Sequence, residues 1–164
     1  MRLFASAAFS ALALMLGACS PASAPAGDEP AASERGLMIG SLVILDGVVF
    51  IPAEGRDVTA GFGTFAANDR AVTIVEAEAP FAQAVELHTH AMDEEGRMAM
   101  RKVENFTVPA NGVHELRRGG DHLMFFGIDR SQLVEGELVP VMVRAEFEDG
   151  TNEVVLLNLK VSQL

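Results

Sequence analysis

The chain has 164 residues, 49% of them hydrophobic, which suits one domain with an apolar core. Its net charge of −11, from 12 basic and 23 acidic residues, disfavours nucleic acid as a partner. It has a single cysteine, so no disulfide within the chain can stabilise the fold.

The first 18 residues have the pattern of a secretion signal. Residues 3 to 16 form an apolar run that is too short to span a membrane as a mature helix. Two small residues then precede Cys19, an order that resembles a bacterial lipobox, in which the cysteine is lipidated. A soluble secreted protein with a chance cysteine is the alternative. We expect cleavage before Cys19 and a lipid anchor on the periplasmic side of a bacterial membrane.

The next segment, residues 19 to 35, is predicted to be a flexible tether. After Cys19 it is made mainly of Pro, Ala, Ser and acidic residues, which bury too little apolar area to fold. Residues 36 to 164 form the expected domain. They consist of short β-prone runs separated by turn residues, with no clear helix of ten residues. About eight strands predict an all-β sandwich, in which "EDG" makes a hairpin turn and "DRSQLVEGE" holds one short helical turn.

Soft metal donors gather in the segment "VELHTHAMDEEGRMAM". Side chains alternate between faces along a strand, so His88 and His90 share one face, and Met98 and Met100 share one face after the turn. If the turn is centred on Glu94, residues whose numbers sum to 188 pair across the hairpin. His88 would then face Met100, and His90 would face Met98, with Cβ atoms about 5 Å apart.

A second pair of donors lies in "GDHLMFFGI", where His122 and Met124 share a face of one strand. His88, Met100, His122 and Met124 together form a soft set of two imidazoles and two thioethers. Thioether sulfur selects monovalent copper over zinc, calcium or magnesium. The alternative is that these residues are incidental, because a single Met in a strand is more often a core residue and a single His more often a polar one.

These motifs resemble the bacterial periplasmic copper chaperone family called PCuAC. The resemblance covers roughly residues 40 to 160 and is carried by "VELHTHAM", "GRMAMRKV", "VPANG", "ELRRGGDHLMFFGI" and "LVEGELVPVMVRAEFEDG". It implies a cupredoxin-like Greek-key β-sandwich or barrel. It also implies a non-enzymatic chaperone that binds one Cu(I) per chain and delivers it to a copper acceptor. That acceptor would be a cytochrome oxidase subunit, chiefly its dinuclear copper centre, or another copper chaperone.

Carried over by position, the resemblance implies His88, Met100, His122 and Met124 as the metal ligands. Eleven residues separate His88 from Met100, one more than is usual in the family, so Met98 remains a rival or auxiliary ligand. We favour Met100, because it keeps the family's 21-residue interval before His122. His90 is an auxiliary candidate, although a position beside the ligands or in solvent is the simpler interpretation.

The remaining residues narrow the function without fixing it. His114 has no partner within reach in the sequence, and we expect it not to be a ligand. The chain has no nucleophile motif, phosphate-binding loop or dinucleotide fingerprint. Two alternatives to delivery stay open: copper buffering or resistance without a dedicated acceptor, and a β-sandwich interaction module that binds no metal.

Overall fold

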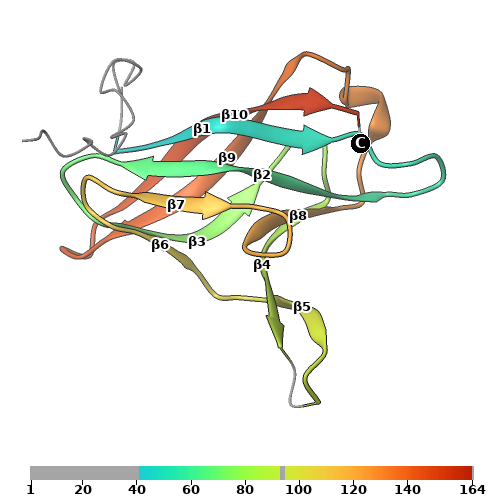
Figure 1. The fold of residues 1–164 in the computed structure, drawn as a ribbon. Coiled ribbons are helices and arrows are strands. Elements are labelled where there is room, and N and C mark those ends of the chain that lie inside the picture. The colour runs from blue at the N-terminus through green and yellow to red at the C-terminus, as the bar shows by residue number, and fades with distance from the viewer. Residues whose placement is uncertain (1–40, 93–94, 164) are drawn as a thin grey trace, which may run out of the picture. The chain divides into compact units, whose positions relative to one another are not determined.

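The computed structural model describes residues 41 to 92 and 95 to 163, which belong to one compact unit. The predicted signal peptide (1–18), the tether (19–35) and Cys19 lie outside the described residues. Figure 1 shows strands joined by loops and almost no helix in the described part. The strands are β1 (Leu42–Phe50), β2 (Val58–Ala67), β3 (Val72–Glu78), β4 (Ala84–Met92), β5 (Met98–Lys102), β6 (Phe106–Val108), β7 (Val113–Leu116), β8 (His122–Phe126), β9 (Leu138–Phe147) and β10 (Asn152–Ser162).

The predicted all-β fold is confirmed, with ten strands in the described part where about eight were expected. The additional strands are short. A 3₁₀ turn, η1 (Arg130–Gln132), forms the helical turn expected before β9. The β9–β10 hairpin turns at Gly150, which has a φ of 79°, as "EDG" predicted. No helix within residues 41–92 and 95–163 is long and apolar enough to cross a membrane.

Seven strands close into a barrel. Neighbouring strands pair in the order β4, β8, β2, β1, β10, β9 and β3, and β3 pairs again with β4 through Ala77 and Val85. All of these pairings are antiparallel except that of β1 with β10, which is parallel. The ring of neighbours is closed at β3 and β4 by the single pair of Ala77 with Val85, and β1 joins β10 through three residue pairs. The short β5, β6 and β7 attach to β4, β3 and β2.

The core fills the barrel because the strands alternate apolar side chains inward. In β9, Val139, Val141, Val143 and Ala145 are buried while Arg144 between them is exposed. Phe125 on β8 packs against Phe81, with ring centroids 5.1 Å apart, and both rings are buried. This apolar interior, rather than disulfides or ion pairs, supplies the stability of the domain.

Strand β4 has two halves with different surroundings. Its first half, Ala84 to His88, pairs with β8 in the barrel wall. Its second half, His88 to Met92, pairs with β5 in a two-stranded ribbon that extends away from the barrel (Figure 1). His88 stands at the junction, opposite His122 on one side and Lys102 on the other.

The expected register of this β4–β5 ribbon is wrong. The paired numbers sum to 190, so His90 faces Met100, Met92 faces Met98 and His88 faces Lys102. The turn is centred on Glu95 rather than Glu94. Gly96, which has a φ of 75°, is not the last residue of the turn, because Arg97 follows it before pairing resumes at Met98. The observed sum of 190 differs from the predicted sum of 188 by an even number, so the side chains keep the faces that the sequence predicted.

Candidate metal centre

One face of β2, β8, β4 and β5 carries the site. Strand β8 supplies His122 and Met124, whose neighbours Leu123 and Phe125 point into the core and are essentially unexposed. His122 lies opposite His88 and Met124 lies opposite Ala60, so the same face continues onto both neighbouring strands. The alternation of β8 therefore fixes one imidazole and one thioether against the barrel.

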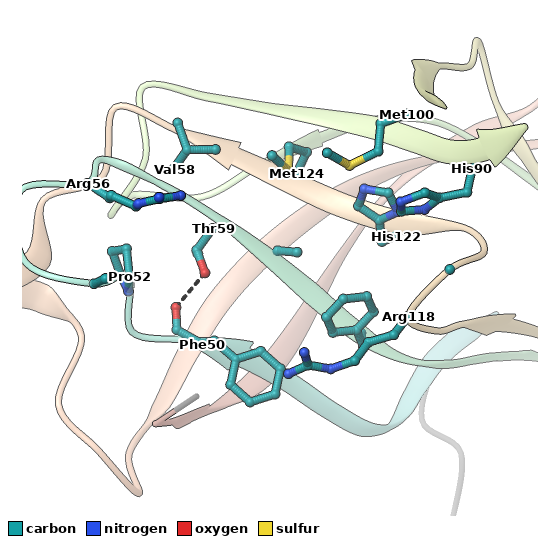
Figure 2. A pocket seen from close by; sticks show the side chains of 14 residues that line it. Phe50, Pro52, Arg56, Val58, Thr59, His90, Met100, Arg118, His122 and Met124 are labelled. Carbon is teal, nitrogen blue, oxygen red and sulfur yellow. Dashed lines mark hydrogen bonds between the residues drawn. The ribbon is translucent and has the colours of Figure 1, made fainter. Parts of the chain in front are cut away.

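His90, Met100, His122 and Met124 line a single pocket of about 690 Å³ (Figure 2). In that view the two thioethers lie together, close to the two imidazole rings. The ring centroids of His90 and His122 are 5.2 Å apart. Met100 is 52% exposed, whereas His122 is only 2% exposed. Three of the four predicted ligands thus come together here, and the predicted auxiliary His90 is the fourth donor that lines the pocket.

His88 does not line this pocket, but it lies beside it. Its ring centroid is 5.7 Å from that of His122. Its Nε2 is 2.8 Å from Glu86 Oε2, and Lys102 Nζ donates to the other oxygen of that carboxylate at 2.9 Å. The hydrogen bond with His88, followed by that from Lys102, lowers the pKa of Glu86, so the carboxylate is ionised and accepts the proton of Nε2.

Two of the imidazoles are oriented by one carbonyl group. Nδ1 of His122 is 3.0 Å from the oxygen of Gly120, and Nδ1 of His90 is 3.3 Å from the same oxygen. Because a carbonyl oxygen only accepts, each Nδ1 must carry the proton, which leaves the lone pair on Nε2. Metal-binding histidines usually donate their second nitrogen in this way.

The surroundings of His122 favour its neutral form. Burial lowers the pKa of His122 below its ordinary value, and the contact with Gly120 opposes that effect only in part. Phe62 packs near the ring on the side of β2, at a centroid distance of 6.1 Å. A neutral imidazole is the form that binds a metal ion.

His88 has the complementary arrangement. When His88 binds a metal ion and donates its Nε2 proton to Glu86, the lone pair available to the metal is on Nδ1. That Nδ1 is buried and has no hydrogen-bond partner. A buried polar atom without a partner is costly in a native protein, and a bound ion is one explanation of such an atom.

The other predicted residues lie elsewhere. Met98 is 58% exposed on the ribbon opposite Met92 and does not line the pocket. His114 is on β7, where its ring stacks on Phe106 at 5.0 Å and its Nε2 is 2.9 Å from Asp121 Oδ2. No group of three or more His, Cys, Asp or Glu within the described ranges could hold a metal ion. Methionine is not among these four residue types, whereas two of the donors that line the pocket are the thioethers of Met100 and Met124.

Sequence reasoning missed two features of the site, the contacts of Gly120 and of Glu86. The carbonyl of Gly120 was not foreseen, although the Gly-Gly turn before His122 was a signal that the backbone approaches closely there. Glu86 shares a face with His88 two residues away, which would have been enough to suggest their contact. Arg118 lies over the rings of Phe50 and Phe62, at 4.8 and 5.7 Å, and forms a cationic wall of the pocket.

Comparison with known families identifies the chain. Residues 42–159 match the family described as "Putative lipoprotein LpqE-like". The chain belongs to the LpqE-like family. No curated protein matches it.

Solved structures confirm the predicted resemblance to PCuAC domains and the cupredoxin-like fold. A copper-bound PCuAC domain from PmoF2 is 15% identical, with a TM-score of 0.58 over 76% of this chain and 95% of that one. Apo-DR1885 from Deinococcus radiodurans is 28% identical, with a TM-score of 0.52 over 91% and 97% of the two chains. The Cu(I) form of DR1885 is also 28% identical, with a TM-score of 0.53 over 80% and 83%. This LpqE-like chain thus resembles both copper-loaded and copper-free domains.

Proposed function

We propose that this LpqE-like protein binds one Cu(I) ion and passes it to an acceptor outside the cytoplasm. The observation that carries the proposal is the convergence of Met100, Met124 and His122 in one pocket, with two further imidazoles within ring contact of His122. Thioether and neutral imidazole donors match the softness of Cu(I) and need no deprotonation beyond that of histidine. The structural resemblance to copper-bound PCuAC domains supports the same cargo.

The proposed ligands are His88, Met100, His122 and Met124. His122 would bind through Nε2 and His88 through its unpartnered Nδ1, each with its second nitrogen already engaged. His90 is the auxiliary donor, since its Nε2 is also free to bind and it lies opposite Met100. Met98 lies outside the pocket, which favours Met100 as the hairpin ligand.

Copper binding is tested by anaerobic titration of the protein against a coloured Cu(I) chelator, with Zn²⁺ in a parallel titration. We expect one tightly held Cu(I) per chain and no comparable zinc binding. X-ray absorption of the Cu(I) form should give a mixed nitrogen and sulfur shell. Equal affinity for zinc, or a shell without sulfur, would contradict the proposal.

Delivery is the finer part of the proposal. We propose that the acceptor is a copper site in cytochrome oxidase or in a second chaperone, since Met100 is exposed and an incoming ligand can replace it. The role requires no catalytic group, because the ion leaves in the oxidation state in which it arrived. A deletion strain that loses oxidase activity at low copper would support delivery. Copper sensitivity without oxidase loss would instead favour buffering.

Membrane attachment through Cys19 is part of the same proposal. The family's description as a lipoprotein and the lipobox-like sequence support it. Replacing Cys19 with Ser should release the protein from the membrane fraction into the soluble extracytoplasmic fraction. Retention of the Cys19→Ser protein on the membrane would exclude a lipid anchor at this residue.

A further inference from the structure

The outer end of the β4–β5 ribbon carries two methionines that the pocket does not use. Met92 and Met98 are directly paired across the ribbon and are 65% and 58% exposed. Single exposed apolar residues are common on protein surfaces, but these two face each other on a ribbon that buries little. They lie on the same face as His90 and Met100, one pair further along the ribbon.

Two thioethers so placed can reach a common ion. Directly opposed residues have Cβ atoms about 4.5–5.5 Å apart, and a methionine side chain has three rotatable bonds. The next pair on the same face, His90 with Met100, is two residues away, a distance of about 7 Å along the strand. An ion held by Met92 and Met98 would therefore be one short step from the pocket.

We infer that Met92 and Met98 form a second, weaker Cu(I) site through which the ion enters and leaves the pocket. This inference rests on the proposed function. Two thioethers without an imidazole give incomplete coordination, so the ion keeps an open position for a ligand of the acceptor. Each step forms one Cu–S bond and breaks one bond to a pocket ligand. The copper stays Cu(I), and no proton moves on a thioether.

The test follows the methionine methyl groups during anaerobic Cu(I) titration of the full-length protein labelled with ¹³C at these methyls. The first equivalent should shift Met100 and Met124, and the second should shift Met92 and Met98. Met142 on β9 lies away from the pocket and is the internal control, which should not move. If Met92 and Met98 do not shift after the pocket is saturated, the inference is wrong.

Variants separate this inference from the proposed function. Met92→Leu with Met98→Leu keeps side-chain volume and should abolish the second step, whereas Met142→Leu should retain both steps. The double variant should also release Cu(I) to excess bicinchoninate several-fold more slowly than Met142→Leu. Equal release rates would rule out a transfer role for the pair. In the double variant His122→Ala with Met124→Leu, the pocket response should be lost while the methyl signals of Met92 and Met98 still shift. If the signals of Met100 and Met124 do not shift in the wild type, the proposed function is refuted instead.

Discussion

The two sides of the pocket are built differently. On the barrel side, His122 and Met124 lie on β8, and the residues that follow each of them, Leu123 and Phe125, are core residues with at most 1% exposure. On the ribbon side, Met100 is 52% exposed on β5, which pairs only with β4 in the described part of the chain. The barrel side fixes donors by packing, whereas the ribbon side presents donors to solvent.

In the proposed function the protein holds an ion and then releases it, and the contrast assigns these two tasks to different sides of the pocket. Donors fixed by a packed core keep their geometry without a cost of ordering when the ion binds. Exposed thioethers can be replaced one at a time by ligands of a partner. The barrel side should therefore dominate affinity, and the ribbon side should dominate exchange.

The largest effect is expected from removing both barrel-side donors. His122→Ala with Met124→Leu should abolish the tight binding of Cu(I) in the pocket, because it removes one imidazole and one thioether from the fixed half of the site. Chelator competition measures the loss, and circular dichroism checks that the fold is retained. Affinity that stays at the wild-type level would show that the ribbon, and not the barrel, holds the ion.

The next largest effect is a difference in the free energy of unfolding between a substitution in the barrel core and one on the ribbon. Phe125→Ala empties a fully buried position against Phe81 and should lower the free energy of unfolding by about 3–5 kcal/mol. Met98→Leu, on the exposed ribbon, should change it by less than about 0.5 kcal/mol. Urea denaturation of the copper-free proteins measures both. A large loss in Met98→Leu would mean that the ribbon contributes to the core.

Removal of the ribbon-side ligand should cost less than removal of the barrel-side pair. We expect Met100→Leu to weaken Cu(I) binding by about tenfold, or 1.4 kcal/mol, and to speed release. Leu preserves the volume of the side chain, so lost coordination is the main change. Met142→Leu is the matched control. An unchanged affinity in Met100→Leu would return Met98 to consideration as the hairpin ligand.

The sequence predicted more of the barrel side than of the ribbon side. The alternation in His122–Met124 placed both donors on one face because the flanking apolar residues left only one face for the core. The ribbon has no such restraint on its register, since its turn length, set around Gly96, decides which residues pair. That is why the faces of His90 and Met100 were predicted correctly while their partners were not.

Contacts made by the backbone were also beyond the sequence pattern. Gly120 accepts from two histidines that are 32 residues apart in numbering, His90 and His122, and only the closed barrel brings them to one carbonyl group. The same holds for the position of His88 between β8 and β5. Periodicity identifies faces, but it does not identify which strands become neighbours.

The two histidines of β4 offer a sharper comparison, because His88 ends the barrel half of the strand and His90 lies on the ribbon. We expect His88→Ala to weaken Cu(I) binding by about tenfold or more and His90→Ala to weaken it less, since His88, unlike His90, has a buried nitrogen without a hydrogen-bond partner. The double variant should lose more than either single one. A larger loss in His90→Ala than in His88→Ala would make His90 the ligand and His88 its neighbour.

Glu86 provides the smallest and most specific test. Glu86→Gln keeps an oxygen that can accept from His88 Nε2 but removes the charge that holds the imidazole in that orientation. If His88 binds through Nδ1, Cu(I) affinity should fall by up to about tenfold, the lower end of the effect of such supporting residues. Glu76→Gln, which removes a carboxylate paired with Arg144 away from the pocket, is the control and should have no effect. A loss in Glu86→Gln that persists in the His88→Ala background would show that Glu86 acts on the pocket through Lys102 rather than through His88. Lys102, which belongs to the ribbon, is the other residue that donates a hydrogen bond to the Glu86 carboxylate in the described part of the chain.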